Sequence, residues 1–292
     1  MTTTLHCLAY NAHLFVDTAV ELSAKQVYND TIRINGIITQ IQNLKPDIVS
    51  LSEVWANNSK EEFTERLKEE LPYSAWDDNK KILQIGSGLL LLSRFPLSHI
   101  SFTKYTSLVG SDSLSQKGFI IATVEVGGQK LLIACTHVQA DDNSAAIEAR
   151  KSNISQLKNG ISNAAGVSTP VILLGDLNII GENQSGTPTD EYKSLCDTLK
   201  SLQMSDSYPT LHPDATSAPG YTYDAVNNKL IARFAPSDAN NKVRERLDYI
   251  FVRGITPTSV TVLDSFTFQP PDETAEWDLS DHYPLDGKFS IQ

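Results

Sequence analysis

Apolar residues fall in short runs along this chain, and polar residues follow several of those runs where each one ends. Pro170 precedes an apolar run at 171–174 that is rich in branched side chains, as in a buried strand, and Gly175 ends it. Asp176 and Asn178 come next. Side chains two residues apart in an extended segment point to the same face, so we expect both to face one site. An ordinary turn rich in Asp and Asn is the alternative interpretation.

The same pattern recurs at other predicted strands. Apolar runs at 5–10, 46–53 and 130–136 end at, or lead directly to, Asn11, Glu53 and His137 respectively. A run at 246–252 carries a carboxylate among apolar residues, and two polar residues precede a last strand at 285–291. Those three residues are Asp248, Asp281 and His282. An exposed surface charge is the alternative interpretation of Glu53, and an ordinary histidine is the alternative for His137 and for His282.

Helical spacing of apolar residues predicts helices at 31–44, 59–71, 144–164 and 189–202. Ser59 and Glu62 form a predicted capping box for the second of these. Gly127 and Gly128 predict a hairpin turn between strands at 119–126 and 130–136. Residues 205–245 show little periodicity and are interpreted as long loops around short strands. Without an internal repeat or a linker, residues 1–292 are expected to form a single domain.

Composition narrows the class of protein. The chain has 292 residues, of which 40% are apolar, so it can bury a large core without disulfides. Cys7 and Cys135 lie in apolar runs, where reduced thiols are expected. Neither a signal peptide nor a membrane-spanning run is present in the sequence, so we expect a soluble, cytoplasmic protein, favour a monomer and find no support for secretion. A net charge of −11 weighs against non-specific nucleic-acid binding.

The polar residues at the strand ends indicate metal-dependent hydrolysis. Carboxylates and amides provide oxygen ligands that suit Mg²⁺, for which Mn²⁺ or Co²⁺ can substitute. A Zn²⁺ site would be expected to contain more nitrogen or sulfur ligands. Two histidines beside such a cluster can act as a base and a donor when an activated water attacks a phosphate ester. No nucleophile elbow, P-loop or Cys-x-x-Cys motif offers a competing chemistry in this sequence.

The order of these motifs resembles the endonuclease/exonuclease/phosphatase superfamily over nearly the whole chain. The specific part is Gly-Asp176-Leu-Asn178, Arg-Leu-Asp248-Tyr and Ser-Asp281-His282. The resemblance implies an α+β fold of the DNase I-like type, which is a four-layer α/β/β/α sandwich of two packed, mostly antiparallel mixed sheets flanked by helices. It also implies a site at one end of that sandwich.

The resemblance also implies a role for each residue. Glu53 would be the principal metal ligand, with Asn11 and Asp281 beside the ion. His282, oriented by Asp248, would deprotonate the attacking water. His137 and Asn178 would stabilise the phosphoryl oxygens, and Asp176 would position the nucleophile or assist the leaving group.

Within the superfamily, two segments look like those of the neutral sphingomyelinases. They are Asp112-Ser-Leu-Ser-Gln-Lys117-Gly and Thr-His137-Val-Gln-Ala. By this resemblance, Asp112 and Lys117 would shape the substrate end of the site, although a solvated turn lysine is the alternative for Lys117. The stretch 264–278, where secreted relatives carry a membrane-inserting aromatic hairpin, offers only Phe266, Phe268 and Trp277.

The expected function is therefore a Mg²⁺-dependent phosphodiesterase that cleaves sphingomyelin or a related phospholipid, at a membrane surface, into a lipid alcohol and a phosphorylated head group. A metal-dependent nuclease on the same fold is the first alternative, and nucleic acid would be the partner only in that case. A non-catalytic binding module is the second alternative.

Overall fold

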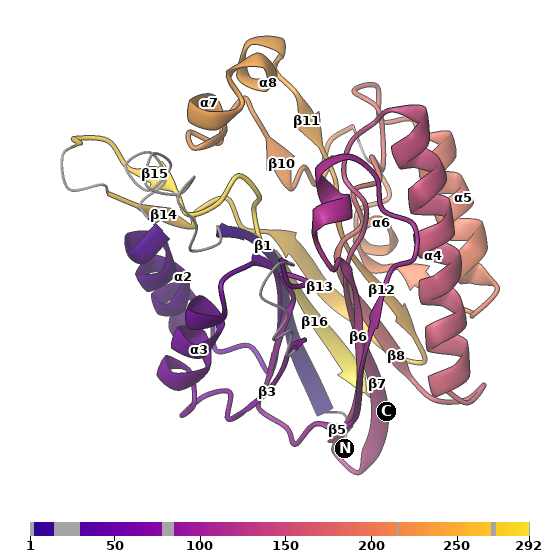
Figure 1. The fold of residues 1–292 in the computed structure, drawn as a ribbon. Coiled ribbons are helices and arrows are strands. Elements are labelled where there is room, and N and C mark those ends of the chain that lie inside the picture. The colour runs from indigo at the N-terminus through magenta and orange to yellow at the C-terminus, as the bar shows by residue number, and fades with distance from the viewer. Residues whose placement is uncertain (1–2, 15–29, 78–84, 215, 270–272, 292) are drawn as a thin grey trace.

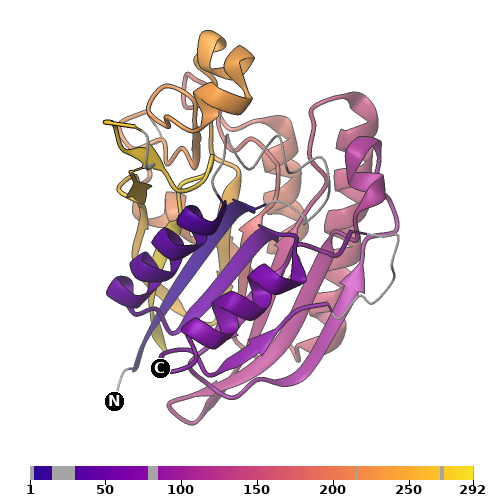
Figure 2. The ribbon, with the colours of Figure 1, turned by 60° about the vertical axis from the view of Figure 1, so that its left-hand side comes forward.

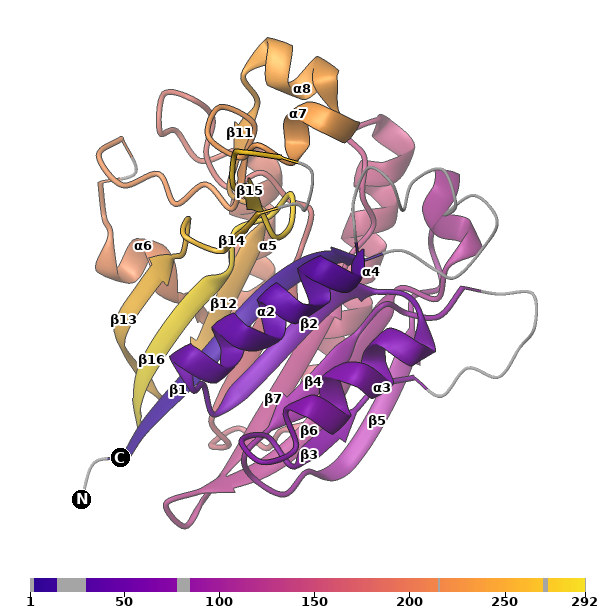
Figure 3. The ribbon, with the colours of Figure 1, turned by 90° about the vertical axis from the view of Figure 1, so that its left-hand side faces the viewer.

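Two six-stranded sheets pack face to face and carry helices on both outer faces (Figure 1). The computed structural model describes residues 3–14, 30–77, 85–214, 216–269 and 273–291. Helices α2 (Asp30–Leu44) and α3 (Asn57–Arg66) lie across one sheet, and α4 (Ser144–Ala164) and α5 (Asp190–Lys200) cover the other (Figure 1, Figure 3). The four-layer sandwich expected from the sequence is confirmed.

Each sheet is built around one parallel pair of strands with antiparallel strands on both sides. The first sheet has the order β13 (Thr256–Val262), β16 (Leu285–Ile291), β1 (Thr3–Leu14), β2 (Ile48–Val54), β4 (Leu90–Ser93), β3 (Tyr73–Ala75). The second has the order β5 (Ser98–Lys104), β6 (Gly118–Val126), β7 (Gln129–His137), β8 (Val171–Asp176), β12 (Asp248–Arg253), β9 (Ser205–Asp206). The parallel pairs β1–β2 and β7–β8 therefore each bring two carboxyl ends to one edge.

Three hydrophobic clusters fill the spaces between the layers. Along β1, Leu5, Cys7 and Ala9 face the interior between the two sheets, whereas Leu8 and Tyr10 face α2. This alternation follows from the two-residue period of a strand that is covered on both faces. A third cluster lies between the second sheet and helices α4 and α5. All three cysteines are free, and the two expected to be buried thiols are buried.

Short elements lie at one end of the sandwich, opposite the two chain ends, as Figure 1 and Figure 2 show. They include the hairpin β10 (Tyr223–Asp224) and β11 (Arg244–Glu245), helices α7 (Ile231–Phe234) and α8 (Pro236–Asn241), and the hairpin β14 (Thr267–Phe268) and β15 (Trp277–Asp278). The 3₁₀ helix η1 (Gly110–Leu114) precedes β6, and α6 (Ser207–Leu211) follows β9. None of the helices in the described part of the chain is long and apolar enough to cross a membrane.

Several expectations of local structure need correction. Strand β1 continues to Leu14, so Asn11 lies within the strand and not after it. The capping box of Ser59 and Glu62 is wrong, because α3 begins at Asn57 and the Ser59 N–H bonds to the side chain of Asn58. The region at 205–245 contains three short helices besides its short strands, and β3, β5, β13, β14 and β15 had no counterpart among the predicted strands.

Gly175 is the position where the central strand tolerates no side chain. Its φ is 139°, and a Cβ built on it would lie 2.0 Å from the carbonyl oxygen of Thr136 on the neighbouring strand β7. The two backbones can approach this closely only because Gly175 has no side chain. Since Asp176 follows directly, this approach also fixes where its carboxylate emerges.

We predict that Gly175→Ala lowers the free energy of unfolding by about 3 kcal/mol or more, because it adds a steric clash to an unfavourable backbone conformation. Gly166→Ala is the matched control, since its added Cβ meets only the Thr169 hydroxyl at 3.5 Å. Urea unfolding of both variants measures the difference. Equal stabilities for the two variants would contradict the proposed close approach.

Candidate active site

Asp176 lies at the centre of a cluster that the strand register assembles. On β8 it pairs with His137 of the parallel strand β7 and with Asp248 of the antiparallel strand β12. Asn11, from the other sheet, donates through Nδ2 to Oδ2 of Asp176 at 2.9 Å and to Oε1 of Glu53 at 3.2 Å. The predicted residues from both sheets therefore meet at one end of the sandwich.

His282 and Asp248 form a buried hydrogen-bonded pair. Nδ1 of His282 lies 2.7 Å from Oδ2 of Asp248, and its Nε2 lies 4.0 Å from Oδ2 of Asp176. Burial lowers the pKa of His282, but the carboxylates of Asp248, Asp281 and Asp176 outweigh it and hold the pKa well above its ordinary value. With Nδ1 occupied by a carboxylate, the imidazole presents Nε2 to the site.

The segment before His282 is fixed by backbone contacts. The Ser280 hydroxyl donates to the carbonyl oxygen of Asn11 at 2.7 Å and accepts from the N–H of His282 at 3.2 Å. The ring of Tyr223 packs edge-on against the imidazole, with centroids 5.6 Å apart. These contacts tie the loop between β15 and β16 to the end of β1.

His137 and Asp176 carry unusual protonation states. Burial, together with the charge of Lys117, holds the pKa of His137 well below its ordinary value, so its imidazole is neutral at neutral pH. Burial and the nearby carboxylate of Asp248 raise the pKa of Asp176 to about 7. Nε2 of His137 lies 3.6 Å from Asp176 and 3.8 Å from Glu53. Strongly perturbed groups gathered in one place are typical of functional sites.

Asp176 and Asn178 come together through a turn, and the extended geometry expected for them is wrong. Asn178 has a φ of 50°, and its N–H donates to Oδ1 of Asp176 at 2.8 Å. Its side-chain Nδ2 donates to the carbonyl oxygen of Val138 at 3.0 Å. The two interpretations of this segment, a site and an Asx turn, therefore describe the same residues.

Lys117 and Asp112 form a buried pair at the edge of the cluster. Nζ of Lys117 donates to Oδ2 of Asp112 at 2.8 Å and to the carbonyl oxygen of Val138 at 3.3 Å. Only 2% of Lys117 is exposed, so the solvated turn lysine is ruled out. Asp112 also accepts from the N–H of Ala140 at 2.7 Å, which connects η1 to the loop after β7.

His13 belongs to this group of side chains, although the sequence pattern did not single it out. Its Nδ1 lies 3.3 Å from Oε2 of Glu53 and 3.3 Å from Oδ2 of Asp281. The hydrogen bond and charge of His13 outweigh the effect of burial and hold the pKa of Glu53 well below its ordinary value. A histidine two residues after Asn11 was the available signal, but the predicted strand ended at Tyr10.

One subset of these residues in the described part of the chain has the spacing of a metal site. Ligand atoms of Asp176, Asp248 and His282 lie within 4.8 Å of one another. In that subset, however, Asp248 and His282 already satisfy each other through their hydrogen bond. The carboxylates of Glu53 and Asp281 lie outside that subset and converge on one nitrogen, and Glu53 is the more open to water.

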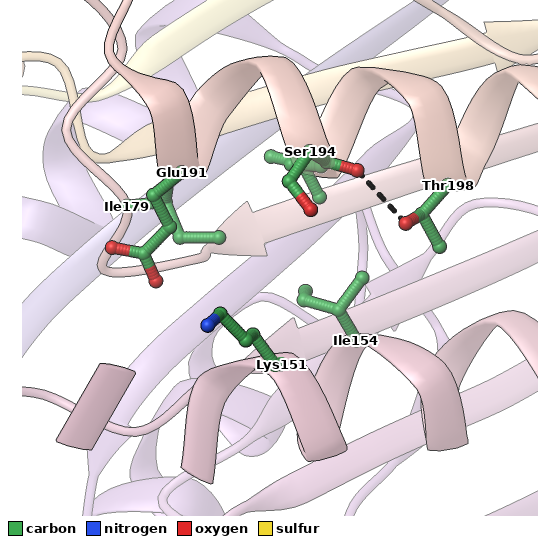
Figure 4. A pocket seen from close by; sticks show the side chains of 7 residues that line it. Lys151, Ile154, Ile179, Glu191, Ser194 and Thr198 are labelled. Carbon is green, nitrogen blue, oxygen red and sulfur yellow. Dashed lines mark hydrogen bonds between the residues drawn. The ribbon is translucent and has the colours of Figure 1, made fainter. Parts of the chain in front are cut away.

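A surface pocket of about 190 Å³ between α4 and α5 is separate from this cluster (Figure 4). Its lining residues are Lys151, Ile154, Ile179, Glu191, Ser194, Leu195 and Thr198, and none of them is a predicted site residue. Figure 4 shows the Thr198 hydroxyl, which donates to the backbone carbonyl oxygen of Ser194 within α5.

A family model for the endonuclease/exonuclease/phosphatase family matches residues 8–282. The chain belongs to this family. Sphingomyelinase C 2 of Leptospira interrogans is 24% identical over 267 residues, and the match covers 82% of this chain and 39% of that protein. The putative neutral sphingomyelinase of Drosophila melanogaster is 28% identical over 273 residues, with 89% of this chain and 56% of that protein covered. The chain thus spans about two fifths to just over half of these two relatives.

Solved structures of the endonuclease/exonuclease/phosphatase family share the fold. The crystal structure of SmcL superposes with a TM-score of 0.77 at 23% identity, covering 98% of this chain and 99% of that one. Sphingomyelinase C from Streptomyces griseocarneus gives 0.76 at 21% identity, covering 99% and 100%. A variant of beta toxin from Staphylococcus aureus with bound magnesium ions gives 0.75 at 20% identity, covering 99% and 100%. The DNase I-like fold expected from the sequence is confirmed.

The aromatic residues of the β14–β15 region are part of the core in this family member. Phe266, Phe268 and Trp277 are buried, and the ring of Phe266 packs edge-on against Tyr10 at 5.6 Å. The guanidinium of Arg233 covers the Trp277 ring at 3.3 Å. These rings therefore do not present an apolar surface to a membrane.

Helices α4 and α5 hold the loop after β7 through one ion pair. Arg150 is 1% exposed, and its guanidinium meets the carboxylate of Glu191 at 2.7 and 2.9 Å. The same guanidinium donates to the carbonyl oxygens of Gln139 and Asp141. Since the N–H of Ala140 bonds to Asp112, the ion pair supports the buried Asp112–Lys117 pair through this loop.

We predict that Glu191→Ala lowers the free energy of unfolding by about 2 kcal/mol, because it leaves the buried guanidinium with only the exposed carboxylate of Asp142, 3.7 Å away, while the partial exposure of Glu191 moderates the loss. Glu148→Ala removes an exposed partner of Lys151 at 2.6 Å and is the matched control, for which we expect a loss of less than about 0.5 kcal/mol. Thermal unfolding of both variants makes the comparison. A loss for Glu191→Ala no larger than for the control would refute the supporting role.

Proposed function

We propose that this chain is a Mg²⁺-dependent phosphodiesterase of the sphingomyelinase C type, which hydrolyses sphingomyelin or a related phospholipid to a lipid alcohol and a phosphorylated head group. The observation that carries the proposal is the buried Asp248–His282 pair, whose free ring nitrogen lies next to a convergence of carboxylates. The relatives of this chain include sphingomyelinases and a phospholipase C, which supports the choice of substrate class.

His282 acts as the general base in this proposal. Because Nδ1 is bonded to Asp248, Nε2 accepts the proton of the attacking water, and Asp248 stabilises the imidazolium that forms. His137, which is neutral, and Asn178, whose amide lies beside it on the next strand end, donate to the phosphoryl oxygens. Asp176, with its raised pKa, lies between the two histidines and positions the water or assists the leaving group.

The donor set fits a hard divalent cation. Glu53 and Asp281 supply carboxylate oxygens, and Asn11 supplies an amide that already contacts Glu53 at 3.2 Å. When bound, Mg²⁺ would supply positive charge to the phosphoryl oxygens and acidify the attacking water. Mn²⁺ or Co²⁺ would serve as substitutes.

Lys117 and Asp112 lie at the substrate end in this proposal. They bond to the segment 138–140 and thereby position the carbonyl oxygen to which the Asn178 amide donates. We place the polar head group of the phospholipid against this segment. Any contact with a membrane surface would have to come from residues other than the buried aromatics of the β14–β15 region.

We predict that the purified protein, in the presence of Mg²⁺, hydrolyses sphingomyelin in detergent micelles faster than lysophosphatidylcholine and leaves plasmid DNA intact. Glu53→Gln should lose at least about 90% of the rate, which corresponds to about 1.4 kcal/mol of barrier, and excess Mg²⁺ should recover little. Head-group release and gel analysis measure the three substrates side by side. Nicking of the plasmid with both lipids intact would establish the nuclease alternative, and binding of lipid with no turnover would favour the binding module.

We predict that Asp248 and His282 act as one unit. His282→Ala and Asp248→Asn should each lower kcat by roughly 10² or more, and the double variant should be little worse than the worse single variant. Asp190→Asn is the control, since that carboxylate is 99% exposed and pairs only with Lys193. Losses that simply multiply in the double variant would show that the two residues are independent.

The dyad also predicts a pH dependence. The base must be deprotonated, so the rate falls as pH decreases through the raised pKa of His282. Asp248→Asn removes the main carboxylate that raises this pKa, so its acid limb should lie at lower pH than that of the wild type, at a lower maximum rate. An acid limb that does not move in kcat–pH profiles would contradict the assignment of His282 as the base.

A further inference from the structure

His13 lies between two carboxylates of the cluster. Its ring lies between Glu53 and Asp281, with Nδ1 at 3.3 Å from one oxygen of each. The ring stacks on Phe234 of α7, with centroids 4.6 Å apart and planes at 28°. The backbone at His13 has a φ of 47°, which turns the side chain toward the two carboxylates.

The spacing of these atoms matches that of neighbouring ligands around one ion. Mg²⁺ and ions of similar size hold their ligands at about 2.0–2.2 Å in octahedral geometry, so adjacent ligand atoms are about 3 Å apart. The two distances of 3.3 Å from the His13 nitrogen are close to that separation. A cation held next to His13 Nδ1 would draw the two carboxylate oxygens inward, so that two carboxylate oxygens and one imidazole nitrogen surround a common centre.

We propose that His13 Nδ1 is a nitrogen ligand of the divalent cation held by Glu53 and Asp281, and that it shifts the preference of the site from Mg²⁺ toward Mn²⁺ and Co²⁺. The inference rests on the metal site of the proposed function. Its chemical reason is that imidazole nitrogen adds little to the binding of hard, strongly hydrated Mg²⁺ but stabilises first-row transition metals. The other interpretation, in which the ring only neutralises the carboxylates, predicts an equal effect on all divalent ions.

The chain offers a substitution that separates these interpretations. His13→Asn removes the imidazole and keeps a residue that tolerates positive φ, so the backbone and the approach of the side chain are preserved. His99→Asn is the matched control, because His99 has a φ of 50° and lies exposed on the edge strand β5. Glu53→Gln tests the site itself.

Calorimetric titration of the purified full chain with Mn²⁺ and with Mg²⁺ measures the preference without any assay of activity. We expect His13→Asn to weaken Mn²⁺ binding about tenfold, which is about 1.4 kcal/mol, and to change Mg²⁺ binding less than about threefold. His99→Asn should leave both affinities unchanged. Equal changes for the two ions in His13→Asn would overturn the proposal.

Electron spin-echo envelope modulation of the Mn²⁺-loaded protein tests the bond directly. Modulation from a bound ¹⁴N should be present in the wild type and in His99→Asn, should change when histidine is labelled with ¹⁵N, and should vanish in His13→Asn. Modulation that persists in His13→Asn, or that is absent from the wild type, would overturn the proposal.

Two results distinguish a failure of this inference from a failure of the proposed function. If the wild type binds Mn²⁺ and Glu53→Gln abolishes that binding, but no nitrogen coupling is seen, the metal site stands and His13 is not its ligand. If the wild type binds neither ion, or if Glu53→Gln binds both as the wild type does, the metal site itself is wrong and the inference falls with it.

Discussion

The crowding of carboxylates at one end of the sandwich is the constraint on which the surrounding structure depends. Glu53, Asp176, Asp248 and Asp281 lie within a region that excludes most water, where an uncompensated negative charge is costly. Each carboxylate has a specific partner that offsets this cost. Asp248 has the imidazole of His282, Asp176 has the Asn11 amide and the Asn178 N–H, and Glu53 and Asp281 share His13. Burial and the neighbouring carboxylate of Asp248 raise the pKa of Asp176 to about 7, and attraction to the surrounding carboxylates raises the pKa of His282.

Long-range register brings these groups together. The parallel pairs β1–β2 and β7–β8 deliver their carboxyl ends to the same edge, and the antiparallel strand β12 begins at that edge with Asp248. Two local contacts then fix the positions of the side chains. Gly175 permits the close approach of β8 to β7, and Ser280 ties the last loop to β1. The cluster therefore depends on residues that carry no chemistry of their own.

The sequence predicted the buried parts of this architecture and missed the exposed ones. Apolar runs identified the central strands, and the polar residues in or after them that meet in the cluster are Asn11, Glu53, His137, Asp176, Asn178 and Asp248. Asp281 and His282 were located by their position before the last strand, and Asp112 and Lys117 only by the resemblance to the neutral sphingomyelinases. Edge strands β5 and β13 escaped notice because their residues are mostly exposed and polar, so no apolar period marks them. His13 escaped because its contacts depend on a positive φ and on partners 40 and 268 positions away, as residue numbers show. The local pattern of apolar and polar residues carries no information on backbone φ or on such distant partners.

The gradient of exposure across the cluster indicates how reactants reach it. The side chain of Glu53 is 22% exposed, that of His282 is 7% exposed, and that of Asp248 is fully buried. A phosphodiester entering from solvent would thus meet the oxygens of Glu53 before it meets His282, and it could sense Asp248 only through that imidazole. Of the proposed metal ligands, Glu53 therefore lies outermost and Asp281, with 9% of its side chain exposed, lies at the depth of His282, whereas the residue proposed to orient the base lies deepest. The side chain of His13, which is 12% exposed, lies between Glu53 and His282 in this gradient, so a metal ligand at that position, as we propose, would change which cation is bound without contacting Asp248.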